Sequence, residues 1–573
     1  MQPSKASAAA GTPGGMQTGS RRGIRAYFDF KRWDFWSWVT FGVYLFMLAF
    51  IVYPLFSLLI NSFFNDKGDL SLQNYANFLK LKYYYTALWN SFKVSALSTV
   101  FAILVGVPLA YVMTRYNVKC KALIQILVIM SLLSPPFIGA YSWILMLGNN
   151  GFLTRFMHDI GIPFTSVYGW KGIVFVFTLQ FYPHIFLYVS GALRTIDTSL
   201  EEAAESLGRN AFQRLMTVTL PLIFPTLSAG ALMVFMASFA DFGTPMLLGQ
   251  GFKVLPILAY EQFISEMGGN PAMASTLSVI LILCSTSILF LQRYFVSRKN
   301  YTMTGMRTPK VQELRTLPKV LLTAGALLVA CVSMIPQATV VVTSFIKTKG
   351  PVFHPGFSLN SYKEILFRVP KAIVNTYSFS LISIVIMVVM GMLVAYVLVR
   401  RKSKLTAALD ALLMIPYVMP GTVLGISMII AFNKPPVILT GTWVILVIAY
   451  VVRKLPYTIR SSTAILHQLD RSVEEASISL GVPPMKTFFK TTGRLMAPGV
   501  LSGAILSWIT TINELSSTIV LYYGATATIS VTIYSEVFTA NYGTGAALAS
   551  ILSISTLVSL LIANKLSKKG LQL

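Results

Sequence analysis

The sequence predicts an all-α polytopic membrane protein with about twelve transmembrane helices, arranged as two tandem six-helix repeats. Three observations predict this class: the composition, a series of long apolar runs and an internal repeat. Of the 573 residues, 55% are hydrophobic and 12% are charged, whereas soluble domains carry roughly 25% charged residues. A soluble chain of this length would divide into several domains with polar surfaces, and this composition cannot supply those surfaces.

Apolar runs long enough to cross a membrane follow one another along most of the chain. A helix needs about 20 apolar residues to cross a hydrocarbon core of ~30 Å. The predicted spans of the first series are 36–60, 91–114, 122–147, 172–193, 222–248 and 274–296. The predicted spans of the second series are 319–345, 373–399, 406–432, 437–452, 495–523 and 542–564. The run 437–452 is the weakest, because Arg453 and Lys454 interrupt it.

The net charge of +26 is distributed as an orientation signal. With the N-terminus taken as cytoplasmic, 33 of the 46 Lys and Arg residues fall in the segments on that side of the membrane. Because basic loops are retained in the cytoplasm, we expect both chain ends to be cytoplasmic. Residues 1–35, which contain no apolar signal-peptide core, and 565–573 are then cytoplasmic tails, the first of them disordered. This distribution argues against nucleic-acid binding, which the charge alone would suggest.

The two series of spans are related by an internal repeat. EEAAESLG at 201–208 matches EEASISLG at 474–481 with an offset of 273. Upstream, GVPLAYVMTR at 106–115 matches GMLVAYVLVR at 391–400 with an offset of 285. An ordered series of such matches indicates that the chain is a tandem duplication.

The repeat divides the chain into two membrane halves, 36–296 and 319–564, which a cytoplasmic linker at 297–318 joins. Both halves have an even number of spans and hence the same orientation, so their pseudo-two-fold axis lies along the membrane normal. Solute pathways form at interfaces of this kind. The alternative is a duplication that serves packing alone.

The long cytoplasmic loops 194–221 and 460–494 carry the clearest motif. In the first loop, carboxylates at Glu201, Glu202 and Glu205 lie on a helical pattern that ends at Gly208, a residue that stops helices. Small alanines within this pattern permit close approach by another surface. We expect a short helix–turn–helix that docks a partner; the alternative is a solvated acidic helix.

These loops resemble the EAA motif of permease subunits of ATP-binding-cassette importers, EAA-x3-G-x9-I-x-L-P. The first half matches it at Glu202, Ala203, Ala204, Gly208, Val218, Leu220 and Pro221. The second half matches it at Glu475, Ala476 and Gly481 and then departs, with Thr491, Gly493 and Arg494 in place of Ile, Leu and Pro. The departure predicts that the second loop leaves its docking helix differently.

The resemblance implies a role for these loops in coupling to two ATPase subunits on the cytoplasmic side. The implied coupling residues are Glu201, Glu202, Ala203, Ala204, Gly208, Glu474, Glu475, Ala476 and Gly481. This chain has no G-x-x-x-x-G-K-[ST] phosphate loop, so ATP and Mg²⁺ would be bound by the partner ATPase and the chain itself would not be an enzyme. The short outside loops imply a separate extracytoplasmic substrate-binding protein. The basic segment 347–371 is suited either to meet an acidic part of that protein or to attract an anionic solute.

Asp241 and Glu514 are the only acidic residues within the predicted spans, and the 273 offset superimposes them. Carboxylates inside a membrane are costly and mark a pathway or a buried partner. We expect both to line the pathway or its gate and to favour a cationic solute; the alternative is that each caps a helix or pairs with a nearby polar group. The four His and three Cys residues are scattered, so no metal site is predicted.

Gly- and Pro-rich clusters recur in the third span of each half, SPPFIGAY at 134–141 and PYVMPGTVLG at 416–425. They indicate broken helices near a pathway, or breaks that are merely tolerated.

Twelve spans with two EAA-type loops in one chain resemble the fused permeases of the ferric-iron importer group, of type I importer architecture. The resemblance implies a multi-pass protein of the bacterial cytoplasmic (inner) membrane, in contact with lipid, whose solute is iron(III). Related permeases carry phosphonates, hexose phosphates or thiamine, which remain alternatives. A proton-coupled secondary transporter is the alternative class, because it too has twelve spans in two halves.

Overall fold

The computed structural model describes residues 34–65, 68–132, 134, 136–163, 166–265, 269–297 and 311–566. Most of the predicted tails and of the predicted linker lie outside these residues. Helices dominate the described part of the chain, and a two-stranded antiparallel hairpin pairs β1 with β2.

The elements of the first half are α1 (Phe35–Met47), a π-helical turn (Leu48–Val52), α2 (Tyr53–Asn61), α3 (Gln73–Lys80), α4 (Lys82–Arg115), α5 (Lys121–Leu132), α6 (Pro136–Leu147), α7 (Phe152–Asp159), α8 (Trp170–Thr195), α9 (Thr198–Ser206), α10 (Ala211–Arg214), a second π-helical turn (Leu215–Thr219), α11 (Leu220–Ala240), α12 (Gly243–Leu248), α13 (Leu255–Ile264) and α14 (Pro271–Ser297).

The elements of the second half are α15 (Thr316–Ser344), β1 (Ile346–Lys349), β2 (Val352–Phe357), α16 (Asn360–Arg368), α17 (Pro370–Arg400), α18 (Lys404–Val418), α19 (Gly421–Phe432), α20 (Trp443–Gln468), α21 (Ser472–Ser479), α22 (Pro484–Thr487), a third π-helical turn (Phe488–Thr492), α23 (Gly493–Ile512), α24 (Thr518–Leu521), a 3₁₀ turn (Gly524–Thr526), α25 (Ile529–Phe538) and α26 (Tyr542–Leu566).

Among the described residues, nine helices are long and apolar enough to cross a membrane, and two bent pairs raise the number to eleven. The bent pairs are α5 with α6–α7 and α18 with α19, with bends of 101° and 108°. These breaks correct the predicted continuous spans 122–147 and 406–432. They fall at the two Gly- and Pro-rich clusters, because proline lacks the amide hydrogen that continues a helix.

The prediction for 437–452 is wrong in its ends. The helix at this place, α20, begins at Trp443 and continues to Gln468, so Arg453 and Lys454 lie within it. Lys454 is buried, with 8% of its surface exposed. A hydropathy pattern ends the span at Arg453 and Lys454, because the pattern contains no information about the distant carboxylate of Glu514 that neutralises them.

Two further predicted spans, 222–248 and 495–523, are also interrupted. In the first half, α11 ends at Ala240 and the short helix α12 begins at Gly243. In the second half, α23 ends at Ile512 and α24 begins at Thr518. The breaks place Asp241 and Glu514 outside helical hydrogen bonding.

The first membrane-crossing helical segment of each half, Phe35–Asn61 and Thr316–Ser344, packs against the other half. The hydroxyl of Tyr53 in α2 donates to the carbonyl of Ala431 in α19 at 3.2 Å. In the reverse direction, Ser142 in α6 donates to the carbonyl of Pro336 in α15 at 2.8 Å. Each half of the sequence therefore contributes its first helices to the packing of the other half.

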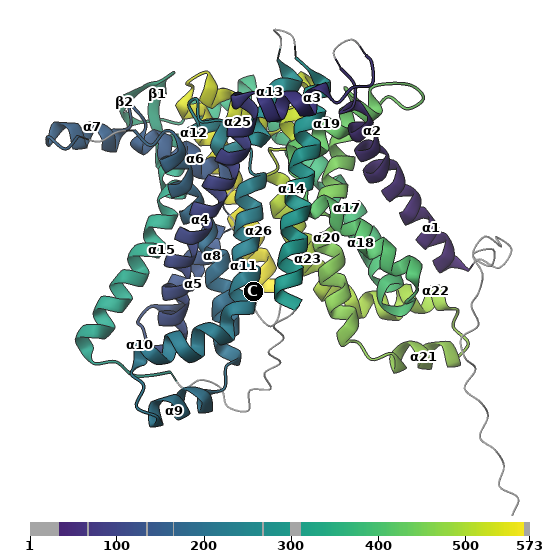
Figure 1. Ribbon diagram of the computed structural model, residues 1–573, viewed down its shortest axis with the longest axis horizontal. Helices are drawn as coiled ribbons and strands as arrows, with labels where there is room; N and C mark the ends of the chain where they lie inside the picture. The colour runs from purple at the N-terminus through teal and green to yellow at the C-terminus, as the bar shows by residue number, and fades with distance from the viewer. Residues whose placement is uncertain are drawn as a thin grey trace, which may run out of the picture.

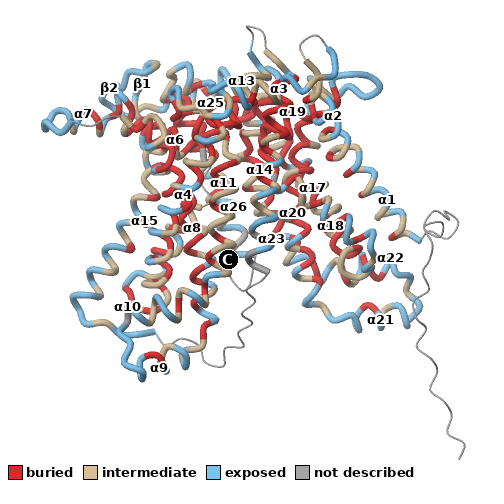
Figure 2. The backbone as a smooth tube through the Cα atoms, viewed as in Figure 1, coloured by how far each residue is buried: buried red, intermediate tan, exposed pale blue. Residues whose placement is uncertain are grey.

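The molecule has two distinct ends (Figure 1). One end carries α9 and α21 at the tips of two separate arms, and we call it the α9/α21 end. The opposite end carries the hairpin β1–β2 with α3 and α13, and we call it the hairpin end. Buried residues gather towards the hairpin end, where the halves meet, and the arms are more exposed (Figure 2).

Candidate functional site

Helix α9 is built by local signals that the sequence displays. Asp197 precedes it, and the Asp197 carboxylate accepts a hydrogen bond from the amide of Ser199 at 2.9 Å, which satisfies an amide that the helix leaves unpaired. Glu201 in the first turn suits the positive end of the helix dipole. Gly208 then turns the chain with φ of +79°, a conformation that glycine adopts without strain.

Helix α21 repeats this construction 273 residues later. Asp470 accepts a hydrogen bond from the amide of Ser472 at 2.9 Å, and this bond holds the pKa of Asp470 below its usual value. Gly481 turns the chain with φ of +83°. Both loops thus begin and end in the same way.

The chain also leaves α9 and α21 in the same way, which corrects the prediction that the departed second motif makes the second loop leave its helix differently. In each half a four-residue helix, a five-residue π-helical turn and a long helix follow in equivalent positions: α10 to α11 in one half and α22 to α23 in the other. Thr491 and Val218 lie within these π-helical turns, and Gly493, Arg494, Leu220 and Pro221 lie in the first turn of the long helix that follows. Turns of this kind frequently occur at functional sites.

The first carboxylate of each motif faces the membrane helices. Glu201 pairs with Arg115, the last residue of α4, at 2.6 Å and accepts a hydrogen bond from Thr219 at 2.9 Å. Glu474 pairs with Arg400, the last residue of α17, at 3.1 Å. Arg115 is buried, with 4% of its surface exposed.

Sequence reasoning missed both arginines as site residues. The signal was present, because the 285 offset aligns Arg115 with Arg400 while the 273 offset aligns Glu201 with Glu474. An offset aligns residues of one half with residues of the other and does not show which residues of one half contact each other. The arginine–glutamate pairs are therefore found only in the structure.

The remaining motif residues mostly face outward. Glu202 and Ala203 of α9 are exposed, as are Glu475 and Ala476 of α21, whereas Ala204 is buried. Directly before the turn glycines, Leu207 and Leu480 are 81% and 85% exposed. Each loop therefore has exposed acidic side chains on its helix and a largely exposed leucine between the helix and the turn glycine.

A cavity of about 510 Å³ lies between the two halves and contains both predicted intramembrane carboxylates in its lining. The first half contributes Gln180, His184, Tyr188 and Asp241, and the second half contributes Tyr417, Arg453, Lys454, Tyr457, Asn513 and Glu514. Buried polar atoms of Gln180, His184 and Asn513 have no hydrogen-bond partner in the structure. The cavity is thus shared by the repeats, and a few charged and polar side chains lie in a lining that is otherwise apolar.

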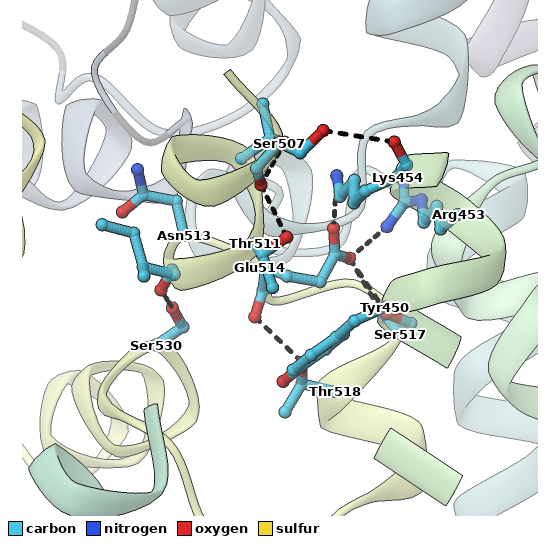
Figure 3. A network of polar contacts seen from close by, with 12 residues as sticks. Tyr450, Arg453, Lys454, Ser507, Thr511, Asn513, Glu514, Ser517, Thr518 and Ser530 are labelled. Atoms are coloured by element: carbon cyan, nitrogen blue, oxygen red, sulfur yellow. Dashed lines mark hydrogen bonds and ion pairs between the residues drawn. The ribbon is translucent and has the colours of Figure 1, made fainter. Parts of the chain in front are cut away.

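Glu514 is held by two cations from α20 (Figure 3). Its carboxylate pairs with Arg453 and, at 2.8 Å, with Lys454, and it accepts hydrogen bonds from the amide and hydroxyl of Ser517 at 3.2 and 3.1 Å. The side chain of Glu514 is 4% exposed, against 18% for Arg453 and 10% for Lys454. The negative charge of Glu514 is therefore neutralised by its partners.

Asp241 has a different environment. It accepts a hydrogen bond from the amide of Thr244 at 2.9 Å and so caps α12. In the register of the repeat, Gln180 and Phe181 take the places of Arg453 and Lys454. Asp241 thus has the helix-capping contact that the sequence offered as an alternative, Glu514 pairs with nearby cations, and both residues belong to the lining of the cavity.

Within the part of the chain that the structure describes, no group of three or more His, Cys, Asp or Glu residues is placed to hold a metal ion.

Comparison with known proteins places the repeat in a family. The model of the family described as "Binding-protein-dependent transport system inner membrane component" matches residues 102–301 and again 387–570. The ferric transport system permease protein FbpB of Actinobacillus pleuropneumoniae is 29% identical over 536 residues, which cover 90% of this chain and 75% of that protein. The putative ferric transport system permease protein FbpB 1 of Haemophilus influenzae is 29% identical over 495 residues, 84% of this chain and 77% of that protein.

Among solved structures, a bacterial ABC transporter involved in the import of the acidic polysaccharide alginate aligns with a TM-score of 0.41 and 17% identity. The alignment covers 48% of this chain and all of that chain.

The two family matches confirm the tandem repeat and decide between an importer permease and a proton-coupled carrier in favour of the permease. Membership implies an ATPase and a substrate-binding protein as partners and a multi-pass location in the inner membrane. The chain therefore belongs to the family of binding-protein-dependent transport system inner membrane components and is a non-enzymatic permease subunit of an ATP-binding-cassette importer that carries the family domain twice.

Proposed function

We propose that this chain imports iron(III) across the bacterial cytoplasmic membrane, driven by two ATPase subunits and supplied by an extracytoplasmic binding protein. The observation that carries the proposal is the pair of matching helix–turn–helix loops, one in each half, with a cavity lined by charged side chains of both halves between them. The relatives named as ferric transport permeases support the choice of solute.

Each ATPase subunit would dock on one of the two loops. Glu202, Ala203 and Glu475, Ala476 with the turns at Gly208 and Gly481 supply the exposed surface. Glu201 and Glu474 act from the other side, because their ion pairs hold the docking helices to the membrane helices, and Ala204 is buried. A movement of the bound ATPase would therefore be transmitted to α4 through the Arg115–Glu201 ion pair and to α17 through the Arg400–Glu474 ion pair.

The α9/α21 end would face the cytoplasm. Basic residues concentrate in the segments that join spans at this end, as the retention of basic loops in the cytoplasm requires. Arg453 and Lys454 lie within α20 and no longer count among the cytoplasmic segments. The excess of basic residues on the cytoplasmic side is still large, because 31 of the 46 are assigned to it by the sequence. Both chain ends would therefore be cytoplasmic.

The solute would pass through the cavity that Asp241 and Glu514 line. A phosphate-bearing solute is the second candidate, because Arg453 and Lys454 are more exposed to the cavity than the carboxylate that they hold. Cationic groups of this kind favour phosphate oxygens.

The test is uptake by proteoliposomes that contain this chain with its ATPase and receive the binding protein outside. We expect radioactive iron(III) to accumulate only when ATP and the binding protein are both present. Accumulation of a phosphonate or hexose phosphate without iron(III) would overturn the choice of solute. Uptake that persists without ATP would overturn the proposed function itself.

A further inference from the structure

The second coupling loop is held by an aromatic cluster that includes a residue from the first half. Trp36, in the first turn of α1, stacks on Tyr396 of α17 with ring centroids 4.0 Å apart and an interplanar angle of 22°. Trp36 also meets Phe488, in the π-helical turn after α22, edge-on at 4.9 Å. Only 2% of Trp36 is exposed, so the indole is fully enclosed by these partners.

The contacts of Trp36 lead directly to the docking helix α21. The hydroxyl of Tyr396 donates a hydrogen bond to Glu474 of α21 at 3.2 Å, and Arg400 donates to the other carboxylate oxygen of Glu474 at 3.1 Å. Glu474 is 7% exposed. The position of the Tyr396 ring thus fixes one of the two supports of this buried carboxylate.

The N-terminal helices connect this cluster to the first half at the other end of the molecule. At the hairpin end, Asn61 of α2 donates to the hydroxyl of Ser275 in α14 at 2.8 Å, and Thr276 donates to the carbonyl of Ser62 at 3.1 Å. At the α9/α21 end, α1 is tied to the second half by the ion pair of Asp34 with Arg401. The segment α1–α2 therefore spans from α14 to the second coupling loop.

The first coupling loop has a different support. Leu215 and Met216 stand where the second loop has Phe488 and Phe489. Glu201 receives its hydrogen bonds from Arg115 and Thr219, whereas Glu474 receives one from a tyrosine that an enclosed tryptophan packs against. The two coupling loops therefore have the same fold, but different side chains hold their helices to the membrane helices.

We propose that Trp36 is a positioning residue for the second coupling helix, acting through Tyr396 and Glu474. The N-terminal helix of one half thereby sets the position of the docking helix of the other half. Its effect on transport rests on the proposed coupling role of α21; its effect on the mobility of α21 does not.

Hydrogen exchange of the assembled complex, followed by mass spectrometry, tests the proposal with α9 as an internal control. In Trp36→Ala we expect the amides of α21 to exchange about fivefold faster, the factor that the loss of one aromatic pair corresponds to, and those of α9 to be unchanged. Trp36→Phe, which keeps a ring, should restore most of the protection. Trp38→Ala, at a half-exposed position of the same helix, should alter neither helix.

Equal acceleration in α9 and α21, or none in α21, would overturn the proposal. Tyr396→Phe removes only the hydroxyl and should accelerate α21 as well, and the double variant Trp36→Ala/Tyr396→Phe should be no faster than the faster single variant. Fully additive effects would show that the two residues act separately and would also overturn it.

Uptake per ATP hydrolysed separates this proposal from the coupling role. If Glu475→Lys lowers the ratio and Trp36→Ala does not, the predicted effect of Trp36 on transport is wrong and the docking role stands. If Glu475→Lys leaves the ratio unchanged, the docking role of α21 fails whatever the exchange data give.

Discussion

Two carboxylates in equivalent positions of the repeat have unequal surroundings. Glu514 lies between Arg453 and Lys454 and is almost completely enclosed, whereas Asp241 is held by a backbone amide and partly exposed. Ionised groups in a poorly hydrated interior are tolerated when they are paired and hydrogen-bonded. The charge network of the second half is therefore structural as well as part of the cavity wall.

Removing the charge of Glu514 should destabilise the protein far more than the same change at Asp241. Glu514→Gln leaves two buried cations without their counter-ion, at a cost of about 3–5 kcal/mol. Asp241→Asn retains an oxygen that accepts the hydrogen bond from Thr244. Thermal unfolding of the purified complex measures the difference, and equal melting temperatures for the two variants would contradict the structural role of Glu514.

Helix breaks and docking helices show what sequence patterns predict at the scale of elements. The turn at Gly208, the acidic first turn of α9 and the breaks at the Gly- and Pro-rich clusters follow from local chemistry, and the sequence indicates all of them. The ends of α20 and the pairing of Arg115 with Glu201 depend on residues 61 and 86 positions away. A local pattern contains no information about such partners, so these features had to come from the structure.

Gly208 is required by its backbone conformation. Proline fixes φ near −65°, which is incompatible with the φ of +79° at this turn. We expect Gly208→Pro to leave membrane insertion intact and to separate ATP hydrolysis from uptake, because α9 then loses its orientation. The matched control is Gly325→Ala in α15, where added volume meets nothing within 4 Å. Normal uptake per ATP in Gly208→Pro would contradict the docking role of α9.

Gly106 and Gly391 occupy equivalent contacts between long helices. A side-chain carbon at Gly106 would lie 2.8 Å from Ile185 and 2.9 Å from the carbonyl oxygen of Tyr182, and one at Gly391 would lie 2.7 Å from Thr458. Gly106→Ala should cost about 1–3 kcal/mol through overpacking, since the backbone of α8 cannot move aside.

Gly42→Ala is the matched control for this packing change, because nothing lies within 4 Å of the added carbon. Alanine also favours a helix by about 1 kcal/mol over glycine. Denaturation of the two variants in the same detergent measures the contrast. A Gly106→Ala variant as stable as Gly42→Ala would show that α4 and α8 do not pack as closely as described.

At the scale of the whole molecule, the interlocked halves give the chain a definite polarity. Cys120 is exposed and follows α4 at the α9/α21 end. An impermeant maleimide should therefore label Cys120 in inside-out vesicles and not in intact spheroplasts, whereas Lys347→Cys in the hairpin should show the reverse. Cys120→Ser provides the background. Labelling of Cys120 from outside would contradict the proposed orientation.

We propose that α9 and α21, one in each half, couple ATP hydrolysis to the passage of solute through the cavity between the halves. The most direct measurement is the uptake of solute per ATP hydrolysed in proteoliposomes for Glu202→Lys, Glu475→Lys and the double variant. Asp159→Lys, the same charge change at an exposed position of α7, which lies at the opposite end of the molecule (Figure 1), is the control. We expect a reduced ratio in each single variant, a ratio near zero in the double variant and an unchanged ratio in the control. A wild-type ratio in the double variant would contradict the coupling role of α9 and α21.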